Sequence, residues 1–169
     1  MATYWTIQTM NKWQEVQHLG YLTGDKDYIW EDFIDSYAWM MEQMKDKLPN
    51  YQGEYPIWLW IERPDLRRSG HLAKNTQGVL LKIELEESDV LLSEFQAWHI
   101  VLNHSFFYLE FEDEDRAYTE DEMRKSWTYI FEIETLKRYP DWGPDVTLQG
   151  VTGKIQLKQI QLEKTFIAR

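Results

Sequence analysis

The chain has 169 residues, a length typical of one domain that buries about 70% of the surface its unfolded form would expose. Hydrophobic residues make up 43% of the sequence and aromatic residues 15%, which excludes a disordered chain, and the lack of cysteine excludes disulfides, thiolate nucleophiles and cysteine-ligated zinc. The net charge of -11 disfavours a nonspecific nucleic-acid binder, which needs a basic surface to displace counterions from phosphates.

Targeting and membrane signals are not evident in the sequence. The N-terminal residues lack the basic and apolar regions of a signal peptide, and no segment approaches the about 18 consecutive apolar residues of a membrane-spanning helix. We therefore expect a cytoplasmic protein that does not interact with membranes.

The first third of the chain predicts a strand, a short helix and a long helix. Residues 3–8 alternate β-branched or aromatic side chains with polar ones, as strands do. Thr9 is the expected N-cap of a helix over residues 10–19, and Gly20 supplies its C-terminal stop. Apolar side chains at helical spacing then predict a helix over residues 28–48.

An aromatic strand followed by a basic loop comes next. Pro56 opens a strand over residues 57–61, in which Trp58 and Trp60 share one face and aliphatic side chains share the other. Pro64 cannot donate a hydrogen bond to a sheet, so the chain must leave the strand here and form a loop that extends to Leu72.

The remaining elements complete a mixed architecture. We expect strands over residues 79–85 and 90–92, a helix that Ser93 and Gln96 cap, a second helix that Thr119 and Glu122 cap, and two strands within residues 146–166. This order predicts a single α+β domain, with a mixed or split antiparallel sheet packed with about four helices.

The loop after the aromatic strand carries the strongest indication of a binding site. Arg67, Arg68 and His71 supply two guanidinium groups and an imidazole that can hold an anion, while Trp58 or Trp60 can contact a ring. Together they predict a pocket for a nucleotide-like ligand. The alternative is that both arginines pair with acidic side chains and both tryptophans pack against helices.

Two further groups of residues are weaker candidates. His99 and Asn103 lie four positions apart on a predicted helix, close enough to orient one small group, although a structural role for the histidine remains open. The acidic run over residues 110–115 lacks the glycine-punctuated spacing of a calcium loop and is expected to be a solvated surface. No metal-ligand spacing is present, and we predict no metal site.

Several segments resemble an uncharacterised bacterial family, a domain of unknown function. They are WTIQ at residues 5–8, YAWMMEQM at 37–44, YPIWLW at 55–60, PDLRRSGHL at 64–72, SDVLLSEFQAWHIVLN at 88–103 and LQGVTGKIQLKQIQLEKTF at 148–166. The segments extend over nearly the whole chain. This resemblance implies no particular activity.

The order of elements also resembles, more weakly, the layout of ADP-ribosyltransferase-like folds. That resemblance implies a split sheet that binds NAD between its halves, with site residues on the first strand and on a late strand. In this sequence the first strand offers Thr6 and Gln8 at that position, and the nearest late position is Gln149. Because glutamine is not a carboxylate, Gln149 departs from the catalytic glutamate of such transferases.

The leading hypothesis is a protein that binds a nucleotide-like anionic small molecule, with NAD or a derivative as the candidate ligand. Arg67, Arg68 and His71 would contact the anion, Trp58 or Trp60 the ring, and Gln8, His99, Asn103 and Gln149 would complete the site. One alternative is a protein-interaction or inhibitor module, phage or defence related, that uses its acidic and aromatic surface. Another is a divergent ADP-ribosyltransferase or NAD hydrolase, so enzymatic activity stays undecided at this point.

Overall fold

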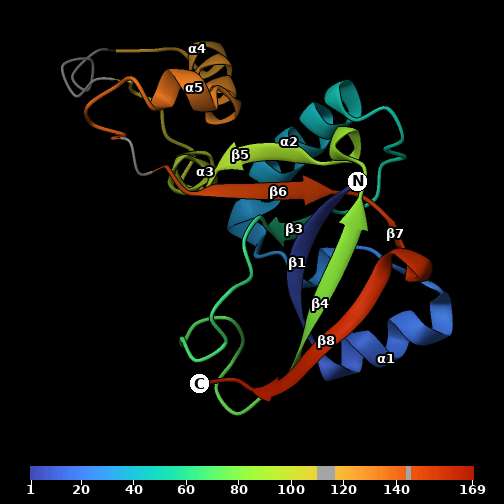
Figure 1. The fold of residues 1–169 in the computed structure, drawn as a ribbon. Coiled ribbons are helices and arrows are strands. Elements are labelled where there is room, and N and C mark those ends of the chain that lie inside the picture. Colours follow the sequence, from blue (N-terminus) through green and yellow to red (C-terminus); the bar gives the residue numbers. More distant parts are fainter. Residues whose placement is uncertain (110–116, 144–145) are drawn as a thin grey trace.

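A computed structural model describes residues 1–109, 117–143 and 146–169, and its main element is a six-stranded sheet (Figure 1). The strands are β1 (Ala2–Thr9), β3 (Ile57–Trp60), β4 (Gln77–Leu85), β5 (Leu91–Glu94), β6 (Leu148–Thr152) and β8 (Ile160–Ile167). They lie in the order β5-β6-β3-β1-β4-β8, and each neighbouring pair is antiparallel. The short strands β2 (Tyr21–Leu22) and β7 (Ile155–Gln156) form a second sheet. The predicted α+β class with an antiparallel sheet is confirmed.

The α-helices of the described chain are α1 (Met10–Leu19), α2 (Ile34–Lys47), α3 (Phe95–Leu102), α4 (Glu120–Ser126) and α5 (Ile133–Leu136). The predicted limits of α1 are confirmed, since Thr9 Oγ1 accepts a hydrogen bond from Lys12 N at 3.0 Å and Gly20 follows with φ 83°. The Thr119 cap of α4 is also as predicted.

Three predicted helices differ in their limits or continuity. Helix α2 begins at Ile34, because residues 26–28 and 31–33 form separate 3₁₀ turns before it. The N-cap of α3 is Glu94, the last residue of β5, whose Oε2 accepts from Ala97 N at 2.6 Å, so the helix begins one residue later than a Ser93 cap would place it. The helix predicted after Thr119 is interrupted by a 3₁₀ turn over Trp127–Phe131.

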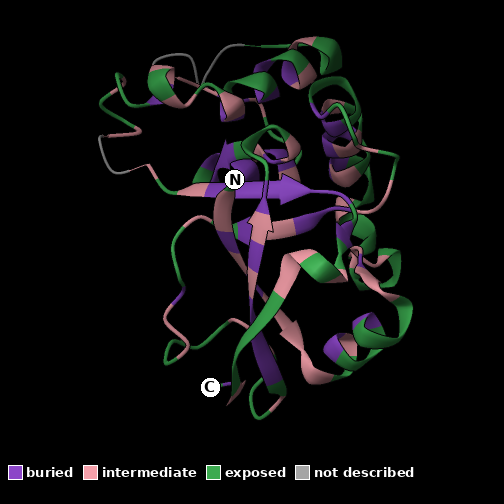
Figure 2. Cartoon of the chain, turned by 45° about the vertical axis from the view of Figure 1, so that its right-hand side comes forward, coloured by how far each residue is buried: buried purple, intermediate pink, exposed green. Residues whose placement is uncertain are grey.

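The two faces of the sheet bury different clusters. Helices α2 and α3 pack with the turn at Trp127–Phe131 in one cluster, which includes Met40 and Met44 and contacts Trp58. Helix α1 packs in the other cluster, against Ile57, Leu59 and the apolar side chains of β4. The predicted division of β3 into a tryptophan face and an aliphatic face is therefore confirmed. Figure 2 shows β6 buried along most of its length, whereas the edge strand β8 is mostly exposed.

The sheet is held together weakly at its centre. Strands β1 and β4 pair along residues 2–9 of β1, and β3 pairs with β6 along its whole length. Between β1 and β3, however, the register contains a single pair, Trp5 opposite Trp60. The sheet therefore consists of two three-stranded halves, β5-β6-β3 and β1-β4-β8, which separate beyond that pair (Figure 1).

The chain just before β3 explains why the strands separate there. Pro56 has no N–H group to donate to β1, and the carbonyl oxygen of Tyr55 accepts from Gly24 N at 3.0 Å. The segment around Gly24 thus uses a backbone acceptor of the chain just before β3 that a continued pairing with β1 would need. A Cβ atom on Gly24 would lie 2.3 Å from the Pro56 carbonyl oxygen, so this close approach requires glycine.

Candidate functional site

A cavity of about 750 Å³ lies where β1 and β3 separate. One wall comes from residues 6–9 of β1 and the start of α1, and the opposite wall from Pro56, Trp58 and Trp60. The segments around Gly24 and Tyr28 and the loop over residues 68–72 close its remaining sides. Its volume is within the range of about 300–1,000 Å³ that is usual for small-molecule sites.

Five of the residues predicted from the sequence line this cavity together: Gln8, Trp58, Trp60, Arg68 and His71. They come from β1, from β3 and from the loop after β3, so the fold joins segments that are about 50 residues apart in the chain. The Gln8 carboxamide is oriented by Thr6, to whose Oγ1 it donates at 2.9 Å.

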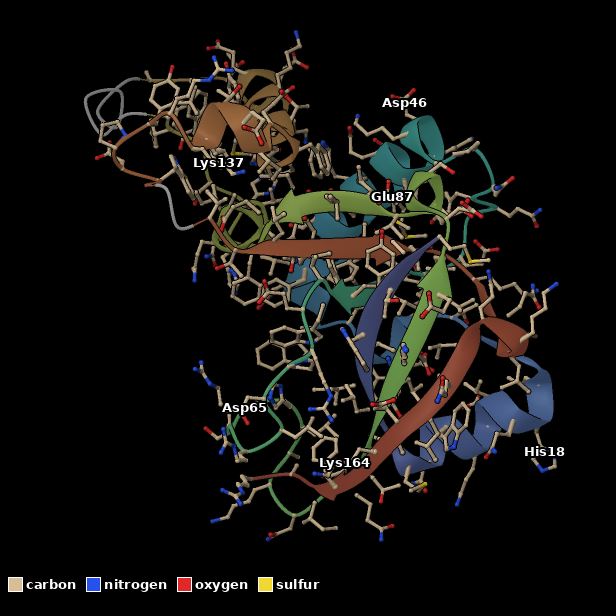
Figure 3. The ribbon with its side chains drawn as sticks, in the orientation of Figure 1. His18, Asp46, Asp65, Glu87, Lys137 and Lys164 are labelled. Carbon is tan, nitrogen blue, oxygen red and sulfur yellow. The ribbon has the colours of Figure 1, made fainter. Side chains whose placement is uncertain are left out.

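Asp65 organises the basic loop, and it is labelled in Figure 3. Its carbonyl oxygen accepts from Arg68 N at 3.2 Å and lies 2.8 Å from His71 Nε2. Its carboxylate accepts from Arg67 N at 3.0 Å, the turn that an aspartate typically forms with the residue two positions later. These bonds fix the backbone that presents Arg68 and His71 to the cavity.

Arg67 does not line the cavity. Its Nε and Nη2 donate to the two carboxylate oxygens of Asp65 at 3.0 and 3.1 Å, and its side chain is 81% exposed. The side-chain and backbone hydrogen bonds from Arg67 lower the pKa of Asp65 to about 2. Arg67 therefore pairs with an acidic side chain, as the alternative interpretation expected for both arginines.

Arg68 differs from its neighbour. Its side chain is exposed at the cavity wall, and in the described part of the chain no acidic side chain pairs with its guanidinium group. All its hydrogen-bond donors on the guanidinium are thus available to an anion. His71 lies beside it, held between the Asp65 carbonyl and the Trp60 ring, with the ring centroids of His71 and Trp60 5.6 Å apart.

A smaller apolar cavity of about 280 Å³ adjoins the first one. The two share Tyr37, Trp58, Trp60 and Phe95 as lining residues. We call this smaller cavity the annex. It contains Gln149, a buried residue whose Nε2 donates to Ser93 Oγ at 3.2 Å, and His99, whose Nδ1 lies 2.9 Å from the Phe95 carbonyl oxygen. Predicted residues His99 and Gln149 are therefore close to the main cavity but not in it.

Asn103 lies outside both cavities. It follows the last residue of α3, and its backbone N–H donates to the His99 carbonyl oxygen at 3.0 Å. This bond keeps the helical spacing between His99 and Asn103, yet only His99 lines a cavity. The place of Asn103 in the structure is that of a helix C-cap.

Most residues that line the main cavity were not among the predicted ones, and Lys12, Glu15 and Tyr37 are the three of them that bear most on its chemistry. Lys12 and Glu15 lie on α1 and form an ion pair at 3.6 Å, and Tyr37 lies on α2. In the sequence, Lys12 and Glu15 look like an ordinary exposed pair, and Tyr37 fits the apolar face of its helix. Only the separation of β1 from β3 shows that α1 and α2 both face one cavity.

Glu94 is a buried carboxylate that directly precedes Phe95, a residue that lines both cavities. Both of its carboxylate oxygens accept hydrogen bonds from the backbone. Oε1 accepts from Thr147 N at 3.0 Å and Oε2 from Ala97 N at 2.6 Å. The bond from Ala97 caps α3, and the bond from Thr147 ties the start of α3 to the chain before β6. Glu94 is therefore a structural cap in this arrangement.

Two other expectations concerned membrane-spanning helices and metal sites. No helix among the described residues is long and apolar enough to cross a membrane, and these residues contain no group of three or more histidine, aspartate or glutamate side chains placed to hold a metal ion. The acidic run at residues 110–115 lies outside the described residues, so the acidic-surface alternative stays a prediction.

Comparison with known proteins identifies a family without an assigned activity. A family model described as "Domain of unknown function (DUF3841)" matches residues 3–121. Neither the curated proteins nor the solved structures give a match. The weaker resemblance to ADP-ribosyltransferase-like folds receives no support from these comparisons, whereas the resemblance to an uncharacterised family is confirmed.

Proposed function

The chain belongs to the DUF3841 family, and from the geometry of its main cavity we propose that it binds a nucleotide-like anionic small molecule. NAD and its derivatives are candidates of this class. The observation that carries the proposal is Arg68, an arginine without an acidic partner among the described residues, which lines the same cavity as Trp58 and Trp60.

The anion would contact Arg68 and His71. A guanidinium group can donate two parallel hydrogen bonds to a phosphate or carboxylate, which makes arginine well suited to such groups. When His71 is protonated, Nε2–H can donate to the Asp65 carbonyl while Nδ1–H is available to the anion. Both side chains are presented by one loop whose backbone is fixed by Asp65.

The ring of the ligand would contact an indole. Trp60 is 41% exposed, a high value for a tryptophan in the middle of a sheet, and its ring faces the loop through His71. Stacking of a base or other ring on such a side chain contributes about 1–3 kcal/mol in nucleic-acid complexes. An exposed Trp60 in the same cavity as Arg68 suits a ligand that carries both a ring and an anion.

The net charge of the protein limits where an anion can bind. At a charge of -11 the chain repels anions in general, so an anion should bind only where a local cation compensates. Lys12 and Arg68 provide such cations from two sides of the cavity, although Lys12 is already paired with Glu15. Arg68 is thus the cation that an incoming anion would reach without displacing an acidic partner.

The neighbouring arginines provide a matched test by ligand-dependent thermal stabilisation. At a ligand concentration of 100 times Kd, binding should stabilise the protein by about 2.7 kcal/mol, which corresponds to a rise of roughly 5–10 °C in Tm. We expect a panel of NAD, ADP-ribose and ribose 5-phosphate to contain at least one stabilising compound. Arg68→Ala should weaken its binding about 10- to 100-fold, because a hydrogen bond to a charged group contributes about 1.5–3 kcal/mol.

Arg67→Ala is the control, because it removes the same charge from the adjacent position outside the cavity. It should retain the stabilisation by ligand. If no compound of the panel stabilises the wild-type protein, or if both substitutions weaken binding equally, the assignment of the anion to Arg68 is wrong.

A further inference from the structure

The annex beside the main cavity is lined mainly by aromatic side chains. Trp58, Trp98 and Tyr37 form a contiguous group, with ring centroids 5.1 Å apart for Trp58 and Trp98 and 5.7 Å apart for Tyr37 and Trp98. Phe95 and Trp60 complete the wall that the annex shares with the main cavity. Such a surface favours a planar ring, which can stack on or pack edge-on against these side chains.

Tyr37 lines both cavities, and its hydroxyl group makes one hydrogen bond within the protein. Its oxygen accepts a hydrogen bond from Trp58 Nε1 at 3.0 Å. No described residue accepts the hydroxyl hydrogen of Tyr37, which is therefore available to a ligand. Burial raises the pKa of this phenol, so the hydroxyl keeps its proton at neutral pH and stays a donor.

Gln149 supplies the opposite kind of group. Its Nε2 donates to Ser93 Oγ at 3.2 Å, and no described donor contacts its Oε1, which leaves that oxygen as an acceptor at the annex. Gln149 is only 9% exposed, but no buried side-chain nitrogen or oxygen of the described residues lacks a hydrogen-bond partner, so its unpartnered Oε1 is an accessible atom that a ligand can reach. The annex thus combines aromatic walls with one donor, from Tyr37, and one acceptor, from Gln149.

We propose that the annex is the ring subsite of the ligand, and that Tyr37 and Gln149 select a planar ring that carries a hydrogen-bond acceptor and a donor on one edge. An aminopurine edge and a ring carboxamide both have this pattern. The inference rests on the proposed function, because the anion attached to this ring would lie at Arg68 in the main cavity.

The shared lining explains how one ligand can occupy both spaces. Trp58 and Trp60 lie on one face of β3 and line both cavities, so a ligand that follows this face passes from the anion site into the annex. Tyr37 is positioned at the passage by its bond to Trp58. Tyr37 is therefore a specificity-determining residue in this proposal, and not part of the anion site.

Three probes that share ribose 5-phosphate can test the proposal: ribose 5-phosphate itself, AMP, and nicotinamide mononucleotide. Their affinities are measured by calorimetric titration. We expect AMP or nicotinamide mononucleotide to bind at least about tenfold tighter than ribose 5-phosphate, from stacking in the annex. Tyr37→Phe keeps the aromatic ring and should reduce this preference about three- to tenfold, the value of one hydrogen bond, without changing the affinity for ribose 5-phosphate.

Two further variants make the result decisive. Tyr129→Phe removes a hydroxyl from a tyrosine that lines neither cavity and should leave the preference unchanged. Gln149→Leu should lower the preference independently of Tyr37, and melting temperatures of all variants report whether they fold.

The outcomes separate this inference from the proposed function. If ribose 5-phosphate binds in an Arg68-dependent way but the ring-bearing probes bind no tighter, or if Tyr37→Phe retains the full preference, the annex is not the ring subsite while the anion site stands. If none of the three probes binds, both proposals are overturned.

Discussion

The glycine that separates the two halves of the sheet offers a demanding test of the fold, through the substitution Gly24→Ala. The new Cβ would lie 2.3 Å from the Pro56 carbonyl oxygen and 2.8 Å from that of Tyr55. Reaching a tolerable 3.0 Å from Pro56 requires a shift of 0.7 Å (3.0 minus 2.3), which strains or breaks the 3.0 Å hydrogen bond from Gly24 N to Tyr55 O. Losing the bond costs about 1 kcal/mol and the overpacking about 1–3 kcal/mol, so we expect a destabilisation of about 2–4 kcal/mol.

Urea unfolding followed by tryptophan fluorescence measures this free energy of unfolding. The control is Gly53→Ala, where the new Cβ meets no atom within 4 Å and only the positive φ of 93° is unfavourable, a penalty of about 1–2 kcal/mol. Gly24→Ala should also weaken ligand binding, because Gly24 lines the main cavity. A Gly24→Ala protein within about 0.5 kcal/mol of the wild type would refute the explanation given for the split in the sheet.

Two more predictions concern the core and the basic loop. Met40→Ala should destabilise the protein by about 2–5 kcal/mol in the same urea assay, because Met40 is 0% exposed in the cluster of α2 and α3; a loss below about 1 kcal/mol would mean that this cluster is loosely packed. The Asp65 carboxyl should titrate near its folded pKa of about 2, below its ordinary value of 3.8. Its contribution to loop stability is therefore present above pH 3.8 and is lost as the pH falls through about 2. In Arg67→Ala the pKa of Asp65, followed by NMR, should rise towards 3.8, and an unchanged pKa would show that Arg67 is not its cause.

Local sequence signals predicted much of the secondary structure. Thr9 and Gly20 mark the limits of α1, because a cap depends on residues within one turn of each other. The alternation of β3 likewise separates Trp58 and Trp60 from Ile57 and Leu59 without knowledge of the neighbouring strands.

The element boundaries that were predicted wrongly depend on contacts between residues far apart in the sequence. Ser93 has the residue type of a helix cap, but β5 pairs with β6 as far as Glu94, so the strand ends one residue later and Glu94 caps the helix. The gap between β1 and β3 depends on the contact of Gly24 with Tyr55, about 30 residues away, which no local pattern reveals.

The candidate site was predictable in composition but not in detail. An aromatic strand next to a basic loop identified Trp58, Trp60, Arg68 and His71, since neighbouring segments stay close in space. Which arginine faces the cavity was decided by Asp65, whose turn holds Arg67. Tyr37 and Lys12 were missed because their helices reach the cavity only through the tertiary fold.

The most direct measurement of the central claim is an NMR titration with ADP-ribose that follows the side-chain N–H signals of the tryptophans and arginines. Binding should shift the indole signals of Trp58 and Trp60 and the Nε signal of Arg68, while the signals of Trp39 and Trp127, which are buried in the helical cluster, should not move. At an ADP-ribose concentration equal to the wild-type Kd, Arg68→Ala should lose most of these shifts, because a 10- to 100-fold weaker affinity leaves less than about a tenth of the protein bound. A bound ligand that leaves Trp60 and Arg68 unchanged, or that shifts signals elsewhere, would contradict the placement of the site between β1 and β3.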